Sequence, residues 1–137
     1  MHPDFDFPPI ETARLLLRPL SEGDVPAFFD LFSDPAVTRY WSAPPMTGHD
    51  QAAARLDAIV KQYEIGDVLQ MGIEHKADGV LVGTCTLHQI HRQNRRAELG
   101  YALGSAWWGR GLMHEALVAF VGHAFGRMKL HRLEADI

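Results

Sequence analysis

The feature that most constrains this chain is a run over residues 97–125, in which a strand pattern, a glycine-rich turn and a helix pattern follow one another directly. Residues 97–103, AELGYAL, are typical of a strand, and residues 104–111 hold three glycines and two tryptophans. From Met113 on, apolar residues recur at the spacing of one helix face. The start of a helix presents backbone N–H groups without partners and the positive end of the helix dipole, which together can bind a phosphate. The run therefore predicts an anion site at the turn.

The two glycines nearest the predicted helix, Gly109 and Gly111, would let an anion approach the backbone closely. Taken alone, glycines before a helix are more often an ordinary loop. The dinucleotide-binding pattern Gly-x-Gly-x-x-Gly needs a third glycine where His114 stands, and the Walker A pattern needs a Gly-Lys-Ser/Thr that this sequence lacks. Any nucleotide bound here is therefore recognised in another way.

Apolar periodicity and turn residues place the other elements along the chain. Predicted strands cover residues 13–20, 68–74, 80–90, 97–103 and 130–137, and predicted helices cover residues 21–34, 47–65 and 112–125. A chain of 137 residues is the size of one domain. The order β-α-α-β-β-β-α-β therefore predicts a single α/β domain with a mixed sheet.

Some local features are predicted more finely. Thr47 begins a helix-capping pattern, and the apolar stripe of the helix after it includes Ala53 and Val60. Gly100, in the middle of a strand, predicts a bulge or a close backbone approach. The acidic, proline-containing residues 1–9 are predicted to be flexible.

Charge and hydropathy patterning exclude several classes of protein. The chain has 13 basic and 17 acidic residues, a formal charge of −4, so no nucleic acid is expected as a partner despite the short basic stretch at residues 91–96. No apolar run approaches the ~20 residues of a transmembrane helix, so no membrane is expected either. The N-terminus lacks the basic start and apolar core of a secretory signal. A cytoplasmic location is therefore predicted.

The single cysteine and the histidines were weighed as reactive or metal-binding groups. Cys85 has no second cysteine for an intramolecular disulfide, and its strand context favours a buried, unreactive thiol. His114 and Glu115 would need a histidine at position 118 for the zinc-protease pattern, and that position is Val118. No metal site is predicted.

Residues 97–117 resemble the acetyl-CoA motif of the GNAT superfamily of N-acetyltransferases. The resemblance is strongest to the RimJ/RimL-like branch, the ribosomal-protein N-terminal acetyltransferases. Members of that branch carry a similar Glu-(Ile/Leu)-Gly-Tyr strand, then Trp-Gly-(Lys/Arg)-Gly and a Glu-Ala-Leu helix. Residues 12–19, TARLLLRP, look like the family's Thr-x-Arg-Leu-x-Leu-Arg opening, so the resemblance covers about residues 10–137.

The sequence departs from the family pattern in two places. Ala106 stands where the family usually has Gln or Arg. The family's Asn-x-x-Ser region, following helix and final β-hairpin have no counterpart after residues 130–137. The resemblance therefore implies one GNAT domain over residues 1–137 that lacks the usual C-terminal helix and hairpin, and we expect the domain to be incomplete at that end.

The resemblance implies acetyl-CoA as cosubstrate and assigns residues to it. Arg110 would face the pyrophosphate together with the N–H groups of the turn, the alternative being a solvated loop charge. Tyr40 and Trp41 fall where the family shapes the acceptor cleft, although core packing is the alternative for both. The residues implied to bind the cosubstrate are Leu99, Tyr101, Ala102, Leu103, Trp108, Gly109, Arg110, Gly111, Leu112 and Met113.

Acetyl transfer to an amine also needs a base, because an ammonium has no lone pair with which to attack. Glu98 matches the position at which many members of the family place such a carboxylate. The alternative is a surface carboxylate that pairs with Arg95 or Arg96. Glu98 is the catalytic candidate.

Two functions are compatible with the sequence. The first is an enzyme that transfers an acetyl group from acetyl-CoA to a primary amine, of a protein N-terminus or a small molecule, by direct attack in a ternary complex. The alternative is a non-catalytic acyl-CoA-binding or self-associating module, because residues 130–137 would present an open strand edge. A homodimer through the last strand would cover that edge.

Overall fold

The computed structural model describes residues 1–39, 44–127, 130 and 132–135. Within these residues the strands form one six-stranded sheet in the order β1-β2-β3-β4-β5-β6. The strands are β1 (Ile10–Glu11), β2 (Leu15–Pro19), β3 (Leu69–His75), β4 (Val80–His91), β5 (Arg96–Leu103) and β6 (Arg132–Ala135). Neighbouring strands from β1 to β5 are antiparallel, whereas β6 is parallel to β5. The predicted mixed α/β sheet is confirmed.

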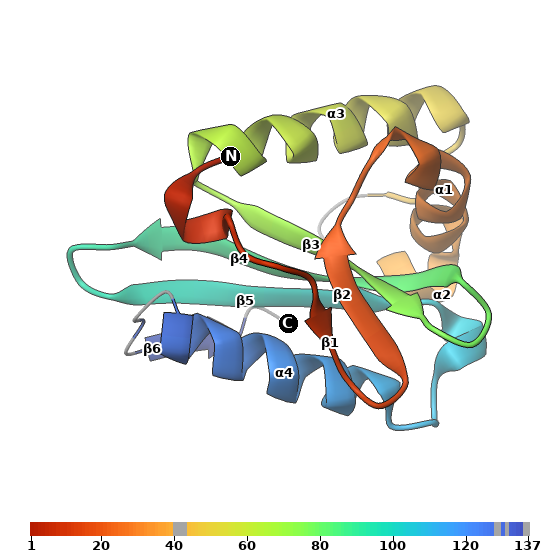
Figure 1. The fold of residues 1–137 in the computed structure, drawn as a ribbon. Coiled ribbons are helices and arrows are strands. Elements are labelled where there is room, and N and C mark those ends of the chain that lie inside the picture. The colour runs from red at the N-terminus through yellow and green to blue at the C-terminus, as the bar shows by residue number, and fades with distance from the viewer. Residues whose placement is uncertain (40–43, 128–129, 131, 136–137) are drawn as a thin grey trace.

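Helices cover both faces of this sheet. The α-helices are α1 (Val25–Ser33), α2 (Pro35–Thr38), α3 (His49–Ile65) and α4 (Leu112–Arg127), and the short 3₁₀ helices are η1 (Pro3–Phe5), η2 (Glu22–Asp24) and η3 (Ser105–Trp107). Figure 1 shows α1 and α3 on one side of the sheet and α4 on the other. The parallel pairing of β5 and β6 fits this arrangement, because the connection between two parallel strands crosses one face of the sheet, here through α4.

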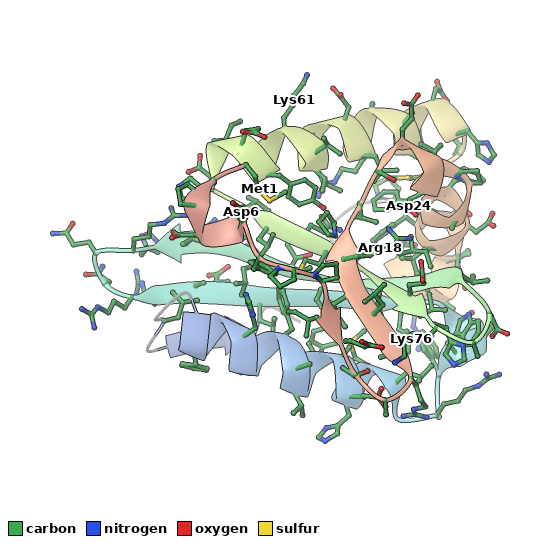
Figure 2. The ribbon with its side chains drawn as sticks, viewed as in Figure 1. Met1, Asp6, Arg18, Asp24, Lys61 and Lys76 are labelled. Carbon is green, nitrogen blue, oxygen red and sulfur yellow. The ribbon has the colours of Figure 1, made fainter. Side chains whose placement is uncertain are left out.

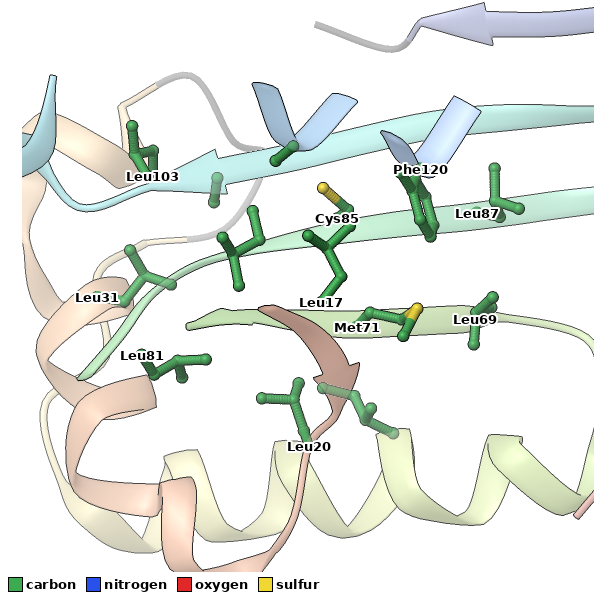
Figure 3. Close-up of a cluster of buried hydrophobic side chains, with 14 of the residues drawn as sticks. Leu17, Leu20, Leu31, Leu69, Met71, Leu81, Cys85, Leu87, Leu103 and Phe120 are labelled. Carbon is green, nitrogen blue, oxygen red and sulfur yellow. The ribbon is translucent and has the colours of Figure 1, made fainter. Parts of the chain in front are cut away.

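The core lies in two layers, one on each face of the sheet. Cys85 and Leu87 of β4 and Phe120 of α4 are all at most 1% exposed and lie together on the α4 side (Figure 3). Leu20 and Leu81 are buried on the side that α1 and α3 cover. Each large apolar side chain removed from water in this way stabilises the fold by ~1.5–3 kcal/mol.

The helices are rotated slightly from the predicted faces. In α3, Ala52 is fully buried, whereas the predicted stripe residues Ala53 and Val60 are exposed. In α4 the buried residues recur every fourth position, while the predicted Phe125 is 41% exposed. The buried residues of α4 are Leu112, Ala116, Phe120 and Ala124.

Two local predictions are wrong. The N-cap of α3 is Gly48, not Thr47, whose N–H donates to the side-chain oxygen of Gln51 at 2.8 Å. The register between β4 and β5 runs without interruption past Gly100 and shifts instead between His88 and His91. A side chain at Gly100 would meet only ordinary contacts, so this glycine marks neither a bulge nor a close approach.

The N-terminal segment is also more ordered than predicted. The N–H of His2 donates to the carbonyl of Tyr63 at 2.7 Å, and Phe5 is only 2% exposed. Residues 1–9 therefore pack along α3 and the sheet, because one buried aromatic ring fixes a short segment that otherwise reads as polar.

Candidate acetyl-CoA site

The strand-to-helix turn adopts a backbone that only glycine accommodates easily. Gly109 and Gly111 have φ angles of 79° and 74°, in the left-handed region. A side chain at Gly109 would meet no atom within 4 Å, so the turn opens on to free space at that point. The glycines that the sequence singled out are thus required by the backbone conformation.

The turn leads directly into the sixteen-residue helix α4. The N–H of Glu115 donates to the carbonyl of Gly111 at 3.1 Å, which is the first backbone hydrogen bond of that helix. The N–H groups of Leu112, Met113 and His114 precede it and have no partner within the helix. They lie at the positive end of the helix dipole, next to the open face of the turn.

Two tryptophans, Trp107 and Trp108, make contacts at the strand-to-helix turn. The indole N–H of Trp108 donates to the carbonyl of Leu103 at 2.8 Å, which ties the turn to the end of β5, while 45% of Trp108 stays exposed. The guanidinium of Arg110 lies over the ring of Trp107, 4.9 Å from its centroid. Trp107 in turn contacts the ring of His75 at 4.9 Å. Arg110 is exposed and beside the turn, where a solvated charge and a phosphate ligand are both possible for it.

A carboxylate of α4 binds the chain ahead of β2. Glu115 accepts hydrogen bonds from the hydroxyl of Thr12 at 2.5 Å and from the N–H and Nε of Arg14 at 2.9 and 2.8 Å. The hydrogen bond from Thr12, followed by those from Arg14, lowers the pKa of Glu115 to about 2 against the effect of burial. Arg14 also donates from Nη1 to the carbonyl of Arg110 at 2.9 Å. Thr12 and Arg14 belong to the family-like opening of the chain, but the sequence alone indicates no role for either.

The edge of β5 continues from this turn. Its residues pair with β4 from Leu103 to Glu98, but with β6 the described pairing ends at Leu99 opposite Ala135. Beyond that point β5 extends past the described part of β6, with Ala102 and Leu103 buried by the core. The backbone of residues 100–103 is therefore the part of β5 that could pair with an extended ligand, and it includes all the implied cosubstrate-binding residues of β5 except Leu99.

Glu98 lies directly opposite His88 in the register of β4 and β5. The Nδ1 of His88 is 3.4 Å from a carboxylate oxygen of Glu98, and the two side chains are 28% and 34% exposed. A half-buried carboxylate beside an imidazole can take up or pass on a proton. The structure thus gives Glu98 a titratable partner that the sequence reasoning did not name.

Buried hydroxyl groups lie on the same face of the sheet. Thr84, Thr86 and His88 are two residues apart along β4, so their side chains lie on one face of the strand. The described residues give no hydrogen-bond partner to either threonine hydroxyl. Position 100, opposite Thr86, has only hydrogen in place of a side chain, and a Cβ there would be 3.8 Å from the imidazole of His88. Of these residues, His88 lies opposite Glu98, whereas Thr86 and Thr84 lie opposite Gly100 and Ala102.

The remaining predictions have different outcomes. Tyr40 and Trp41 lie outside the described residues, so their assignment to the acceptor cleft stays a prediction. Cys85 is buried as expected, and burial raises the pKa of its thiol to about 12. The described residues contain no cluster of three or more metal-ligating side chains. None of the described helices is long and apolar enough to cross a membrane.

Comparison with known proteins bears on the whole chain. A family model described as an acetyltransferase (GNAT) domain matches residues 14–137. The uncharacterized N-acetyltransferase YoaA of Bacillus subtilis is 33% identical over 131 residues, which make up 96% of this chain and 74% of that protein. The ribosomal protein uS5-alanine N-acetyltransferase of Escherichia coli is 25% identical over an alignment of 135 positions that covers 93% of this chain and 68% of that protein.

A solved structure shares the fold. The RimL ribosomal L7/L12 α-N-protein acetyltransferase in complex with coenzyme A matches with a TM-score of 0.76 at 21% identity. The match covers 92% of this chain and 72% of that chain.

Proposed function

Because the chain belongs to the GNAT family of acetyltransferases, which move an acetyl group to an amine, we propose that it binds acetyl-CoA across the turn at residues 108–113 and along β5. The observation that carries this proposal is the turn itself. Two left-handed glycines and the N–H groups at the start of α4 that have no partner within the helix form an open, positively polarised surface, as binding of a pyrophosphate requires.

The cosubstrate supplies an activated acetyl group as a thioester, and the described residues supply its binding. N–H groups of Gly109, Gly111, Leu112 and Met113, with the guanidinium of Arg110, would hold the pyrophosphate. Trp108, fixed through its indole N–H, would offer its exposed ring face to the arm that follows. The backbone of β5 at Tyr101, Ala102 and Leu103, beyond its described pairing with β6, would pair with the pantetheine amides, and Leu99, which pairs with Ala135, would adjoin them.

Glu98 is the group that we propose as the base. In the transfer, a C–N bond forms between the acetyl carbon and the amine, the C–S bond breaks, and the amine loses one proton while CoA leaves as the thiol. Glu98 would take the proton directly or through a water, with His88 at 3.4 Å as the group to which it can be passed. The N–H of Ala102 or Leu103 would stabilise the negative charge that develops on the thioester oxygen.

The acceptor that we propose is a protein N-terminus, as in the RimJ/RimL-like branch. The relative from Escherichia coli, whose name gives an alanine of ribosomal protein uS5 as its acceptor, supports this class. A small-molecule amine is the other acceptor class.

The experiment is an assay of thiol release from acetyl-CoA with three acceptors, namely a peptide with an N-terminal alanine, the same peptide with a blocked N-terminus and spermidine. We expect release with the free peptide only, and a fall in kcat of ~100-fold in Glu98→Gln. Glu22→Gln, an exposed carboxylate of η2, is the matched control and should leave kcat unchanged. Release with spermidine alone would transfer the assignment to small amines, and an unchanged kcat in Glu98→Gln would remove Glu98 from the mechanism.

Self-association through β6 is a further part of the proposal. This strand is one of the two edge strands of the described sheet, and its second edge has no strand beside it among the described residues. An open edge of this kind pairs readily with another copy. Sedimentation velocity over a range of concentrations tests it, and a single monomeric species at all of them would contradict it.

A further inference from the structure

One group of side chains beside the turn has no part in the chemistry described above. It consists of Thr12 and Arg14, ahead of β2, and of Glu115 in the first turn of α4, which are separated by more than a hundred residues in the sequence. Three of the donors of Thr12 and Arg14 converge on one carboxylate, all within 2.9 Å. Such a set of hydrogen bonds fixes the guanidinium of Arg14 in one place.

The guanidinium so fixed reaches the backbone of the turn. Its Nη1 donates to the carbonyl of Arg110 at 2.9 Å, and its Nη2 would be 3.6 Å from a Cβ at position 111. Across a trans peptide bond the carbonyl and the following N–H point in opposite directions. Because Arg14 holds the carbonyl of Arg110 toward itself, the N–H of Gly111 points away from Arg14.

The turn needs this restraint because its glycines do little to fix the conformation of the backbone. Glycine populates positive and negative φ about equally, so the plane of the peptide group beside Gly111 can flip, through changes in φ and ψ, at low cost. In the rotated state a carbonyl oxygen would replace an N–H on the surface that faces the anion, and it would repel a phosphate.

Glu115 by itself would weaken the binding of a phosphate, because its carboxylate, in the first turn of α4, is close to the place where the phosphate would bind. The positive charge of Arg14 compensates that carboxylate at 2.8 Å. The carboxylate in turn holds the arginine. The two groups therefore work as a unit that is nearly neutral toward the site and rigid toward the turn.

We propose that Arg14, held by Glu115 and Thr12, is a positioning residue that fixes the peptide bond between Arg110 and Gly111 so that the N–H of Gly111 faces the pyrophosphate of acetyl-CoA. This inference rests on the proposed function, because it needs acetyl-CoA at the turn. It gives a physical role to the Thr-x-Arg pair at the start of the chain's family-like opening.

The test is titration calorimetry of acetyl-CoA with the full chain and with Arg14→Met. We expect binding roughly tenfold weaker in the variant, the loss of about one hydrogen bond to a charged group. Lys76→Met is the matched control, because Lys76 forms an ion pair with Glu11 at 2.8 Å in the same region without contacting the turn. It should bind acetyl-CoA as the wild type does. Equal affinity of Arg14→Met and wild type would overturn the inference.

Two further measurements separate positioning from a general loss of structure. Arg14→Lys keeps the charge but not the forked geometry, and we expect it to bind more weakly than wild type at an unchanged melting temperature. In ¹H–¹⁵N spectra, the Gly111 amide should shift on addition of acetyl-CoA in the wild type and not in Arg14→Met. The same Gly111 shift in both proteins would contradict the inference.

Glu115→Ala distinguishes positioning from charge by the sign of its effect. If the carboxylate acted only through its negative charge, its removal would strengthen the binding of an anion. Because it holds Arg14, we expect binding several-fold weaker, and equal or stronger binding would overturn the inference. A wild-type chain that does not bind acetyl-CoA would overturn the proposed function and this inference together. Normal binding by Arg14→Met, with loss of binding in Gly109→Val, would overturn only the inference.

Discussion

The two arginines of residues 12–19, Arg14 and Arg18, have different surroundings and different roles. Arg18 of β2 forms two hydrogen bonds with Asp24, both of 2.9 Å, and one with Glu74 of 3.0 Å. Figure 2 shows Arg18 and Asp24 together between β2 and the start of α1. Arg14, four residues earlier, pairs with Glu115 and with the turn instead. Its side chain is 45% exposed, against 22% for Arg18.

The difference lies in how much of each cluster water can reach. Burial alone would raise the pKa of Asp24, but the hydrogen bonds from Arg18 and from the N–H of Ser21 outweigh it and lower that pKa. Hydrogen bonding to Asp24 raises the pKa of Arg18 further. A buried charge is stabilised mainly by its ion-pair partner, whereas an exposed charge is also stabilised by water when the pair is broken. The same short motif thus supplies one arginine, Arg18, that stabilises the fold and a second arginine, Arg14, that contacts the candidate site.

The largest effect is expected from Arg18→Met, which leaves the buried Asp24 and the partly buried Glu74 without their cation. The free energy of unfolding should fall by about 3 kcal/mol, because an uncompensated buried charge costs far more than an exposed pair contributes. Urea titration followed by circular dichroism measures it. A loss under about 1 kcal/mol would mean that the two clusters do not differ as described.

A smaller effect is expected from acid on Glu115. Hydrogen bonding to Thr12 and Arg14 lowers its pKa from 4.5 to about 2, so its contribution to stability is present above pH 4.5 and is lost as the pH falls toward 2. Solvent screening at this partly exposed site reduces that contribution to about 1 kcal/mol.

The measurement is the difference in unfolding free energy between wild type and Glu115→Gln at several pH values. Asp24 also titrates at low pH, but it is present in both proteins and cancels. The gap between the two proteins should narrow from pH 4.5 to pH 2, and a gap that is constant with pH would contradict the lowered pKa.

The smallest effect on stability is expected from Arg14→Met. An exposed ion pair contributes about 1 kcal/mol or less, and the hydroxyl of Thr12 still binds Glu115 in the variant. The melting temperature should fall by only a few degrees. A loss of stability as large as that of Arg18→Met would make Arg14 a second fold residue and remove the contrast.

Much of the fold was predictable because its signals are local. Strands β2 to β6, the hairpin at Gly79 and the helix end at Gly66 follow from apolar alternation and from the glycines, which have positive φ, whereas the two-residue strand β1 was not predicted. The cap of α2 by Asp34 also follows, since its carboxylate accepts the N–H of Ala36 at 2.9 Å. The packing of residues 1–9 was not predictable, because it depends on the burial of one ring, that of Phe5, in a core formed by residues distant in the sequence.

The candidate site divides in the same way. The turn at Gly109 and Gly111 was predictable from its glycines and the helix after it. The pairing of Glu115 with Thr12 and Arg14 joins residues more than a hundred positions apart, and nothing local indicates it. The pairing of Glu98 with His88 required the register between β4 and β5, which a single sequence does not fix.

The most direct test of the central claim, that acetyl-CoA binds at the turn before α4, compares two equally strained glycine substitutions. Gly109 and Gly79 have φ angles of 79° and 64°, and a side chain at either would meet no atom within 4 Å. Gly109→Val and Gly79→Val should therefore lose similar stability, ~1–2 kcal/mol. We predict that calorimetric titration detects acetyl-CoA binding to wild type and Gly79→Val and none to Gly109→Val. Undiminished binding by Gly109→Val would contradict the account.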